Sequence, residues 1–232
     1  AMGALSIDTL LPAMSMIKLH YNLPSKHGHW IITIVFLGIA AGQLFFGPIS
    51  DSIGRKKTSL LGLLILSAGT LISIFSSNHE FFLVGRFFQG LGAGATVVVS
   101  RAIARDIYSG RQLARLMSLV TTIFILVPVL APSIGQLIIS MLSWKLILPI
   151  ILLFAISLSL WIFFFQIETN KNHRQLNVQR TLEDIVEVFK SKVSRSYTIA
   201  AGLTFGILLS FLNISQPLFQ EHLLVGDAFA LY

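Results

Sequence analysis

Seven long apolar runs with few charges constrain this chain more than any other feature of its sequence. Crossing the hydrocarbon core of a bilayer, roughly 30 Å thick, takes about 20 helical residues. Backbone polar groups in lipid need partners inside their own segment, so each run is predicted to be a helix; a barrel would show short alternating strands. The predicted spans are 1–19, 29–49, 58–76, 81–103, 113–140, 144–166 and 197–220. We therefore expect an all-α polytopic membrane protein.

The composition supports this class and excludes several others. The chain is 54% hydrophobic and 12% charged, unlike ordinary soluble domains. Its net charge of +7 does not indicate nucleic-acid binding, because the bases do not gather on a polar domain. The absence of cysteine excludes a disulfide framework, a thiolate zinc site and a cysteine nucleophile. We expect no metal site, since His27 and His29 are only two ligands.

The positions of the basic residues predict the orientation of the spans. Loops on one side carry three bases, which are Lys18, Lys26 and Lys145. Loops on the other side carry thirteen, which are Arg55, Lys56, Lys57, Arg101, Arg105, Arg111, Arg115, Lys171, Arg174, Arg180, Lys190, Lys192 and Arg195. Cytoplasmic loops carry an excess of Lys and Arg, so the second side is predicted to be cytoplasmic.

The longest polar stretch, 168–196, divides the chain into three predicted parts. Residues 1–167 form a six-helix transmembrane bundle whose first helix is truncated. The linker 168–196 contains a short amphipathic helix, because its apolar residues recur at helical spacing: Leu182, Ile185, Val186 and Phe189. Residues 197–232 hold a seventh helix and the start of a truncated second half.

The junction between the second and third spans, Gly47 to Lys57, reads "GPISDSIGRKK". A tight link between two helices needs a turn, which Gly54 provides, and bases to hold the membrane end, which Arg55, Lys56 and Lys57 provide. Asp51 is a candidate to pair with a guanidinium or a helix N-terminus and so to act as a conformational latch. A solvated loop acid is the alternative.

Two ionisable residues, Asp8 and Arg86, lie inside predicted spans and away from the ends of those spans. A charged side chain in the membrane costs about 2.5–3.5 kcal/mol on insertion scales, so it normally faces a wet cavity or a partner. We hypothesise that Asp8 takes and releases a proton, with an affinity that depends on burial and on the distance to Arg86. The alternatives are an interfacial acid for Asp8 and, for Arg86, a structural cation held by backbone carbonyls and Gln89.

Other residues in the spans suggest helix packing or a cavity. The fifth span should bend at Pro128 and Pro132, while Gly135 allows a neighbour to approach. Whether this bend takes part in gating stays open. The pairs Gly38 and Gly42, and Gly90 and Gly94, are predicted small-xxx-small packing sites. Four polar residues are candidates either to line a cavity or to bond between helices: Gln89, Asn213, Ser215 and Gln216.

Four stretches of the sequence resemble motifs of the major facilitator superfamily. The junction resembles its G-x-x-x-D-x-x-G-R-[KR]-[KR] signature, and "GRFFQGLGAGATVVVSRAIARD" resembles its second motif, with Arg86 in the place of the intramembrane arginine. "VPVLAPSIGQ" is similar to the fifth-span motif of proton-driven drug antiporters, although Ala131 and Gln136 stand where glycines are usual. "LSIDTLLPAM" looks like the acidic first-helix motif of the bicyclomycin-resistance branch (Bcr/CflA-type).

This resemblance implies twelve spans in two six-helix halves around a central cavity, of which the chain would be one half plus the seventh helix. It also implies a drug/proton antiporter of the bacterial inner membrane: a monomer that exports amphipathic small molecules, uses the proton gradient and needs no cofactor. An enzyme is not expected, because no histidine or cysteine lies centrally in a span. An uptake transporter for a sugar, metabolite or peptide is the alternative.

Overall fold

The computed structural model describes residues 2–23, 28–170 and 178–217, and all regular structure among them is helical. The all-α class is therefore confirmed. The chain divides into two compact units, Ala1–Arg174 and Gln175–Tyr232, which are described separately below.

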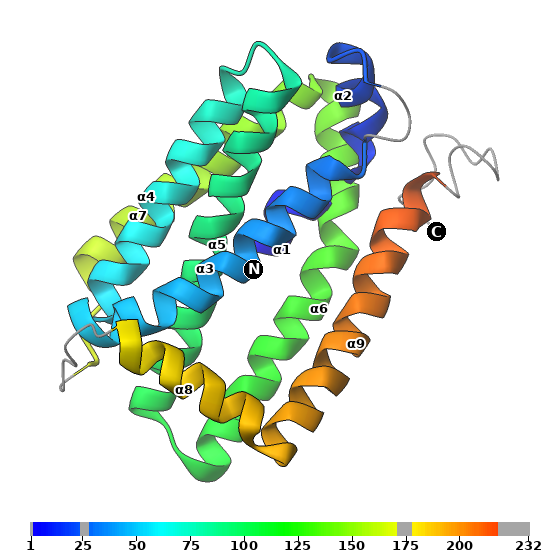
Figure 1. Ribbon diagram of the computed structural model, residues 1–232. Helices are drawn as coiled ribbons and strands as arrows, with labels where there is room; N and C mark the ends of the chain where they lie inside the picture. The colour runs from blue at the N-terminus through cyan, green and yellow to red at the C-terminus, as the bar shows by residue number, and fades with distance from the viewer. Residues whose placement is uncertain (1, 24–27, 171–177, 218–232) are drawn as a thin grey trace. The chain divides into compact units, whose positions relative to one another are not determined.

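Unit 1 holds most of the predicted spans. Its elements are α1 (Met2–Asp8), η1 (Leu11–Ala13), α2 (Met14–His20), α3 (Trp30–Ile53), α4 (Arg55–Ile74), α5 (His79–Ile107), α6 (Gly110–Met141), η3 (Trp144–Leu146) and α7 (Ile147–Phe165) (Figure 1). Five stretches of the described residues are long and apolar enough to cross a membrane: Trp30–Ile53, Arg55–Ile74, His79–Ile107, Gly110–Met141 and Trp144–Phe165. They correspond to the second through sixth predicted spans.

The predicted first span, 1–19, is not one continuous helix. Helix α1 ends at Asp8, a turn follows at Thr9 and Leu10, and the chain continues through η1 into α2. Pro12 supplies the physical reason: it has no N–H to donate to the carbonyl of residue 8, and its ring clashes with that carbonyl. The expectation of an unbroken first helix was wrong, and the break falls directly after Asp8.

Glycines let α3 and α5 pack at close range, as the small-xxx-small pattern predicted. Gly38, Gly42, Gly90 and Gly94 are all buried where these two helices meet. A Cβ added at Gly90 would lie 2.2 Å from the carbonyl oxygen of Val35, so only glycine permits this approach. The packing prediction for these residues is confirmed.

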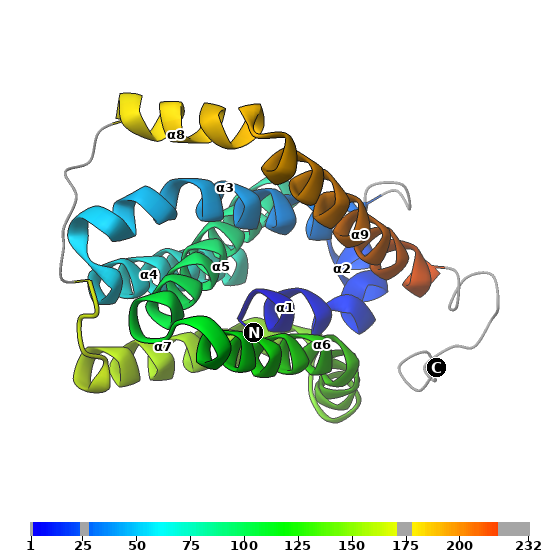
Figure 2. The ribbon, with the colours of Figure 1, turned by 90° about the horizontal axis from the view of Figure 1, so that it is seen from below.

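Helix α1 contacts α3, α5, α6 and α7, and so lies inside unit 1 (Figure 2). Its neighbour α6 is largely exposed, and Ala131 and Gly135 are its buried residues. Helix α6 stays helical through Pro128 and Pro132. Its axis changes direction along its length, in agreement with the predicted bend (Figures 1 and 2).

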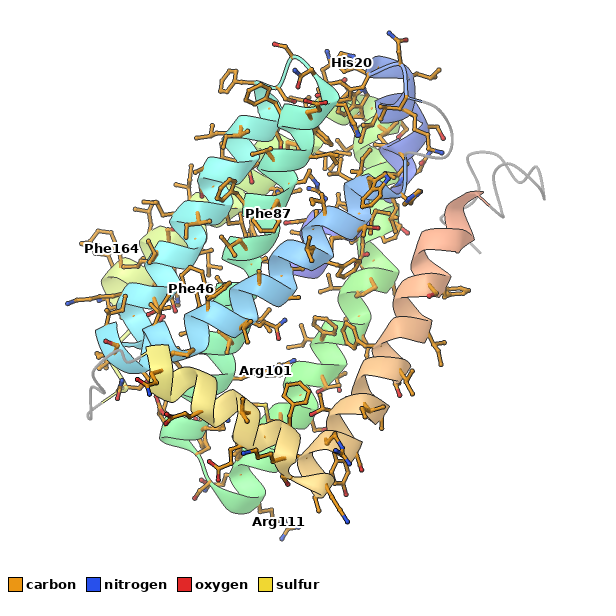
Figure 3. All side chains as sticks on the ribbon, in the orientation of Figure 1. His20, Phe46, Phe87, Arg101, Arg111 and Phe164 are labelled. Carbon is orange, nitrogen blue, oxygen red and sulfur yellow. The ribbon has the colours of Figure 1, made fainter. Side chains whose placement is uncertain are left out.

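Large apolar side chains cover the outer faces of unit 1. Phe164 on α7, for example, is 70% exposed and projects away from the bundle (Figure 3). Ionisable groups gather near the ends, as the labelled His20 and Arg111 show (Figure 3). This distribution suits a bundle whose outer surface faces lipid.

Unit 2 contains α8 (Val178–Lys190) and α9 (Lys192–Pro217). Helix α8 is the short linker helix that the apolar spacing predicted. Val186 and Phe189 on it are 50% and 56% exposed; the side chains of Leu182 and Ile185 lie outside the described part of the chain. Helix α9 begins five residues before the predicted seventh span.

Candidate functional site

Arg86 on α5 is the largest fully buried side chain of the described residues. Its Nη1 donates to Oε1 of Gln89, one turn further along the same helix. Its Nη2 donates to the backbone oxygen of Ser6 on α1, at 3.0 Å. Among the described residues its Nε has no hydrogen-bond partner, and neither has the buried hydroxyl of Ser6. Arg86 is therefore anchored by two neutral oxygens on two helices.

The Ser6 carbonyl is available to Arg86 because α1 ends nearby. In a continued helix the N–H of Leu10 would bond to Ser6 O, four residues earlier. Leu10 N instead bonds to Ile7 O at 3.1 Å, which tightens the last turn. Arg86 takes the freed carbonyl and so caps the C-terminal end of α1, where a cation is favourable.

Asp8 is the last residue of α1 and is only 2% exposed. Across the described residues, ion pairs join Arg55 to acids, but none joins Asp8 to Arg86. Arg86 instead holds the backbone of Asp8's own helix. The contacts of Arg86 are those that the structural alternative expects, so a role for either residue in proton coupling stays a prediction.

Gly135 of the fifth-span motif packs against the chain directly after Asp8. A Cβ added at Gly135 would lie 2.1 Å from the carbonyl oxygen of Thr9. The backbone of Thr9 leaves no room for a side chain at this position, so glycine is required for this contact. Ala131, which departs from the usual motif, is buried one turn earlier on the same face of α6. The bent helix therefore meets α1 at its break.

At the junction, Asp51 lies in the last turn of α3, and a single residue, Gly54, separates α3 from α4. Gly54 has a φ of 100°, which favours glycine, so the predicted turn is confirmed. Asp51 is half exposed, and its Oδ1 accepts from Nη1 of Arg55 at 2.5 Å. This is the guanidinium pairing that the latch hypothesis expected.

Arg55 is the centre of a larger junction cluster, which comprises Ser50, Asp51, Arg55, Asp106, Glu168, Thr169 and Asn170. Its Nη1 also donates to Oγ of Ser50 at 2.6 Å, and its Nε donates to Oδ2 of Asp106 at 2.9 Å. Asp106 lies near the end of α5, so one buried guanidinium joins the ends of α3 and α5. Such charge-assisted bonds are roughly twice as strong as neutral ones.

Glu168 caps the N-terminus of α4. Its Oε1 accepts from the backbone N–H of Arg55 at 2.8 Å and its Oε2 from that of Lys56 at 3.0 Å. Partial burial tends to raise the pKa of this carboxyl, but backbone N–H groups, including those of Asn170, Arg55 and Lys56, lower the pKa below its usual value. The helix-capping role considered for Asp51 thus belongs to Glu168.

This depressed pKa predicts a pH-dependent stability. Glu168 should stabilise the fold above its unfolded pKa of about 4.5 and lose that effect as the pH falls through its lower folded pKa. At pH 7, Glu168→Gln should lower the Tm of the purified protein, by about 2–4 °C for each kcal/mol lost. In acid the two melting curves should converge. Glu183→Gln, at an exposed acid on α8, is the control; a constant gap at every pH would contradict the prediction.

The other predicted junction residues contribute less. Gly47 lines a cavity of about 270 Å³ beside the junction cluster, together with Asp51, Arg55 and Asp106. The Nζ of Lys56 lies 5.8 Å from the ring centroid of Phe163, a cation–π contact, and the side chain of Lys57 is exposed. Both lysines suit the anchoring role expected of them.

Of the candidate cavity residues, Gln89 is fully buried and bonded as described above. Asn213, Ser215 and Gln216 lie in the last turns of α9, and their side chains are outside the described part of the chain. His27 and Lys26 are likewise outside it. For the described residues, no group of three or more His, Cys, Asp or Glu could hold a metal ion.

Sequence reasoning missed the acids that complete the junction cluster. Asp106 ends the second motif, but nothing local to it indicates a partner near residue 55. Glu168 directly follows the sixth span and lies 113 residues from Arg55 along the chain. The helix break after Asp8 is different, because the sequence could have predicted it: Asp8 lies four residues before Pro12, which cannot donate a helical hydrogen bond to the backbone carbonyl of Asp8.

These features define a class: a polytopic helical membrane protein that buries an acid and a guanidinium between its spans and ties its helix ends with a charged cluster. The profile of the Major Facilitator Superfamily matches residues 1–231, and the chain belongs to this family. The family assignment agrees with the expectation that the protein is not an enzyme.

Relatives and a solved structure agree with this assignment. The chain is 32% identical to the Bicyclomycin resistance protein homolog of Haemophilus influenzae, over 89% of this chain and 52% of the relative. It is 31% identical to Multidrug resistance protein MdtL of Salmonella heidelberg, over 93% and 54%. The chain thus spans about half the length of these curated relatives. The human organic anion transporter MFSD10 (TETRAN) shares the fold, with a TM-score of 0.68 at 21% identity, over 99% of this chain and 66% of that one.

Proposed function

We propose that the protein exports amphipathic small molecules in exchange for protons, by alternating access across the bacterial inner membrane. The observation that carries the proposal is the buried carboxyl of Asp8, at a helix break that Arg86 caps from one side and Gly135 packs from another. The names of the bicyclomycin- and multidrug-resistance relatives support the export of drugs.

In this mechanism Asp8 carries the proton. A carboxyl group changes its proton affinity when its surroundings alternate between dry and hydrated, so movement of α1 would load and release the proton. Arg86 cannot practically give up a proton and acts by holding the end of α1. The energy source is the proton gradient, with no cofactor, and the side with the junction cluster is cytoplasmic. The complete protein works as a monomer.

The function is tested with the complete protein in an efflux-deficient bacterium. Export predicts protection against several unrelated compounds, together with drug-stimulated proton release in proteoliposomes. If the protein gives no protection and instead drives proton-linked uptake of a nutrient, the result would support an uptake transporter for a sugar, metabolite or peptide. Facilitated diffusion that ignores the pH gradient would refute the coupling.

The junction cluster is proposed as the latch of one end state, and Asp51→Asn tests it. The variant should insert normally but turn over more slowly, by up to about fivefold, because a half-exposed ion pair is worth up to ~1 kcal/mol. Turnover in proteoliposomes and elution in size-exclusion chromatography measure the two effects. Unchanged turnover would favour the solvated-acid alternative.

A further inference from the structure

We propose that Thr70 on α4 is a positioning residue: its hydroxyl sets the orientation of the Gln89 amide, and through that amide it holds the guanidinium of Arg86. The three side chains are each 0% exposed. The structure contains these hydrogen bonds. Their expected effect on transport rests on the proposed proton-coupled function.

The direction of the hydrogen bonds follows from the single proton on the Thr70 hydroxyl. Thr70 Oγ1 donates to the backbone oxygen of Leu66, four residues earlier, at 2.8 Å. With its proton used, the hydroxyl can only accept from other groups. Nε2 of Gln89 donates to it at 3.0 Å. The hydroxyl therefore selects the NH2 end of the amide.

This selection determines what Arg86 meets. With its NH2 group toward Thr70, Gln89 presents its carbonyl oxygen to the guanidinium, which is a donor only. The reversed amide would set its NH2 group against the donor guanidinium in a buried site. It would also require the Thr70 hydroxyl to turn its proton away from Leu66 O. Because Nε of Arg86 has no partner among the described residues, Gln89 and Ser6 O are its two anchors.

Close packing of α4 on α5 makes the contact possible. A Cβ added at Gly69, next to Thr70, would lie 2.4 Å from the backbone nitrogen of Gln89 and 2.6 Å from the oxygen of Gly85. The two backbones thus approach where the short threonine side chain must reach the amide. The result is one chain of directed bonds across three helices, from Leu66 on α4 through α5 to Ser6 on α1.

The proposed role depends on the hydroxyl group of Thr70 and not on the shape of its side chain, and two substitutions distinguish these. Thr70→Val keeps the shape but removes the acceptor, so Gln89 loses its orienting partner and Arg86 loses a defined anchor. Proton-driven export by the complete protein should fall roughly tenfold, the effect of leaving one buried polar group unpaired, and its pH profile should change. Thr70→Ser restores the hydroxyl and should export within about twofold of wild type.

Ser73→Ala is the matched control. Ser73 is also buried on α4, and its hydroxyl donates to the carbonyl four residues earlier, Gly69 O at 3.0 Å, with a longer contact to Phe82 O. Its loss removes a similar local bond without touching the amide of Gln89. Rate and pH profile should therefore stay near those of wild type. An equal loss in Ser73→Ala and Thr70→Val would overturn the proposal, since it would indicate general weakening of α4.

A double-mutant cycle separates this proposal from the proposed function. In a Gln89→Leu background there is no amide to orient, so Thr70→Val should cause no further loss, and the two changes should be strongly non-additive. The cycle is measured on transport of one substrate, with and without a pH gradient. If transport by wild type does not respond to the pH gradient, proton coupling is refuted, but non-additive losses still support the positioning role of Thr70. Additive losses overturn that role whether or not transport is coupled to protons. Should Thr70→Val not fold, Thr70→Ala enters the same cycle.

Discussion

Replacing Asp8 by asparagine is expected to abolish drug-stimulated proton release while the protein still inserts and folds. Asparagine has nearly the size of aspartate and suits a buried polar position, but it cannot take up or release a proton. In proteoliposomes, proton release on addition of drug should fall to the level of empty vesicles. Exchange of labelled drug at equal concentrations, which needs no proton cycle, should continue.

A surface acid serves as the control for this result. Glu80 lies in the first turn of α5 and is exposed, so Glu80→Gln removes one acid without touching the site. It should release protons as wild type does. Undiminished release from Asp8→Asn would remove Asp8 from the mechanism, whatever the effect on the drug spectrum.

The second large effect is expected from Arg86→Lys, although this change keeps the positive charge. A lysine ammonium is a compact group on a flexible stem and does not reproduce the fork that reaches both Gln89 Oε1 and Ser6 O. One lost hydrogen bond to a charged group is worth about 1.5–3 kcal/mol, so proton-driven transport should fall roughly tenfold or more. Freed from its cap, the end of α1 should also exchange amide hydrogens faster.

Arg101→Lys is the matched control, because Arg101 is an exposed arginine on the same helix (Figure 3). It should transport at the wild-type rate with wild-type hydrogen exchange in α1. A normal rate and pH profile in Arg86→Lys would show that charge alone suffices. In that case the capping of α1 by the guanidinium would not be needed for transport.

Much of the fold could be predicted because the deciding forces are local. The spans of α3 to α7 follow from runs of apolar residues, and the turn at Gly54 follows from the freedom of glycine to adopt positive φ. The packing of Gly90 on α3 follows from the same absence of a side chain. The break after Asp8 could also have been predicted, since Pro12 removes a bond to the carbonyl four residues earlier.

The partners of the buried charges could not be predicted in the same way. Arg86 was placed inside a span with Gln89 as its neighbour, but its second anchor is a backbone oxygen 80 residues away. No sequence motif distinguishes that oxygen from others in α1. Likewise the pairing of Asp51 with Arg55 was a local hypothesis, whereas Asp106 joins the same guanidinium from 51 residues away.

By itself, then, the sequence determined that this protein is a bundle of membrane helices that contains an acid and a guanidinium. It could do so because hydropathy and backbone constraints act over a few neighbouring residues. Only the tertiary structure decided that Arg86 binds the backbone at the end of Asp8's helix instead of forming an ion pair with Asp8. It also decided that the ends of α3, α4 and α5 meet at Arg55. The reason is geometric: a buried group bonds to whatever the packed helices bring within about 3 Å, and distance along the chain has no bearing on that.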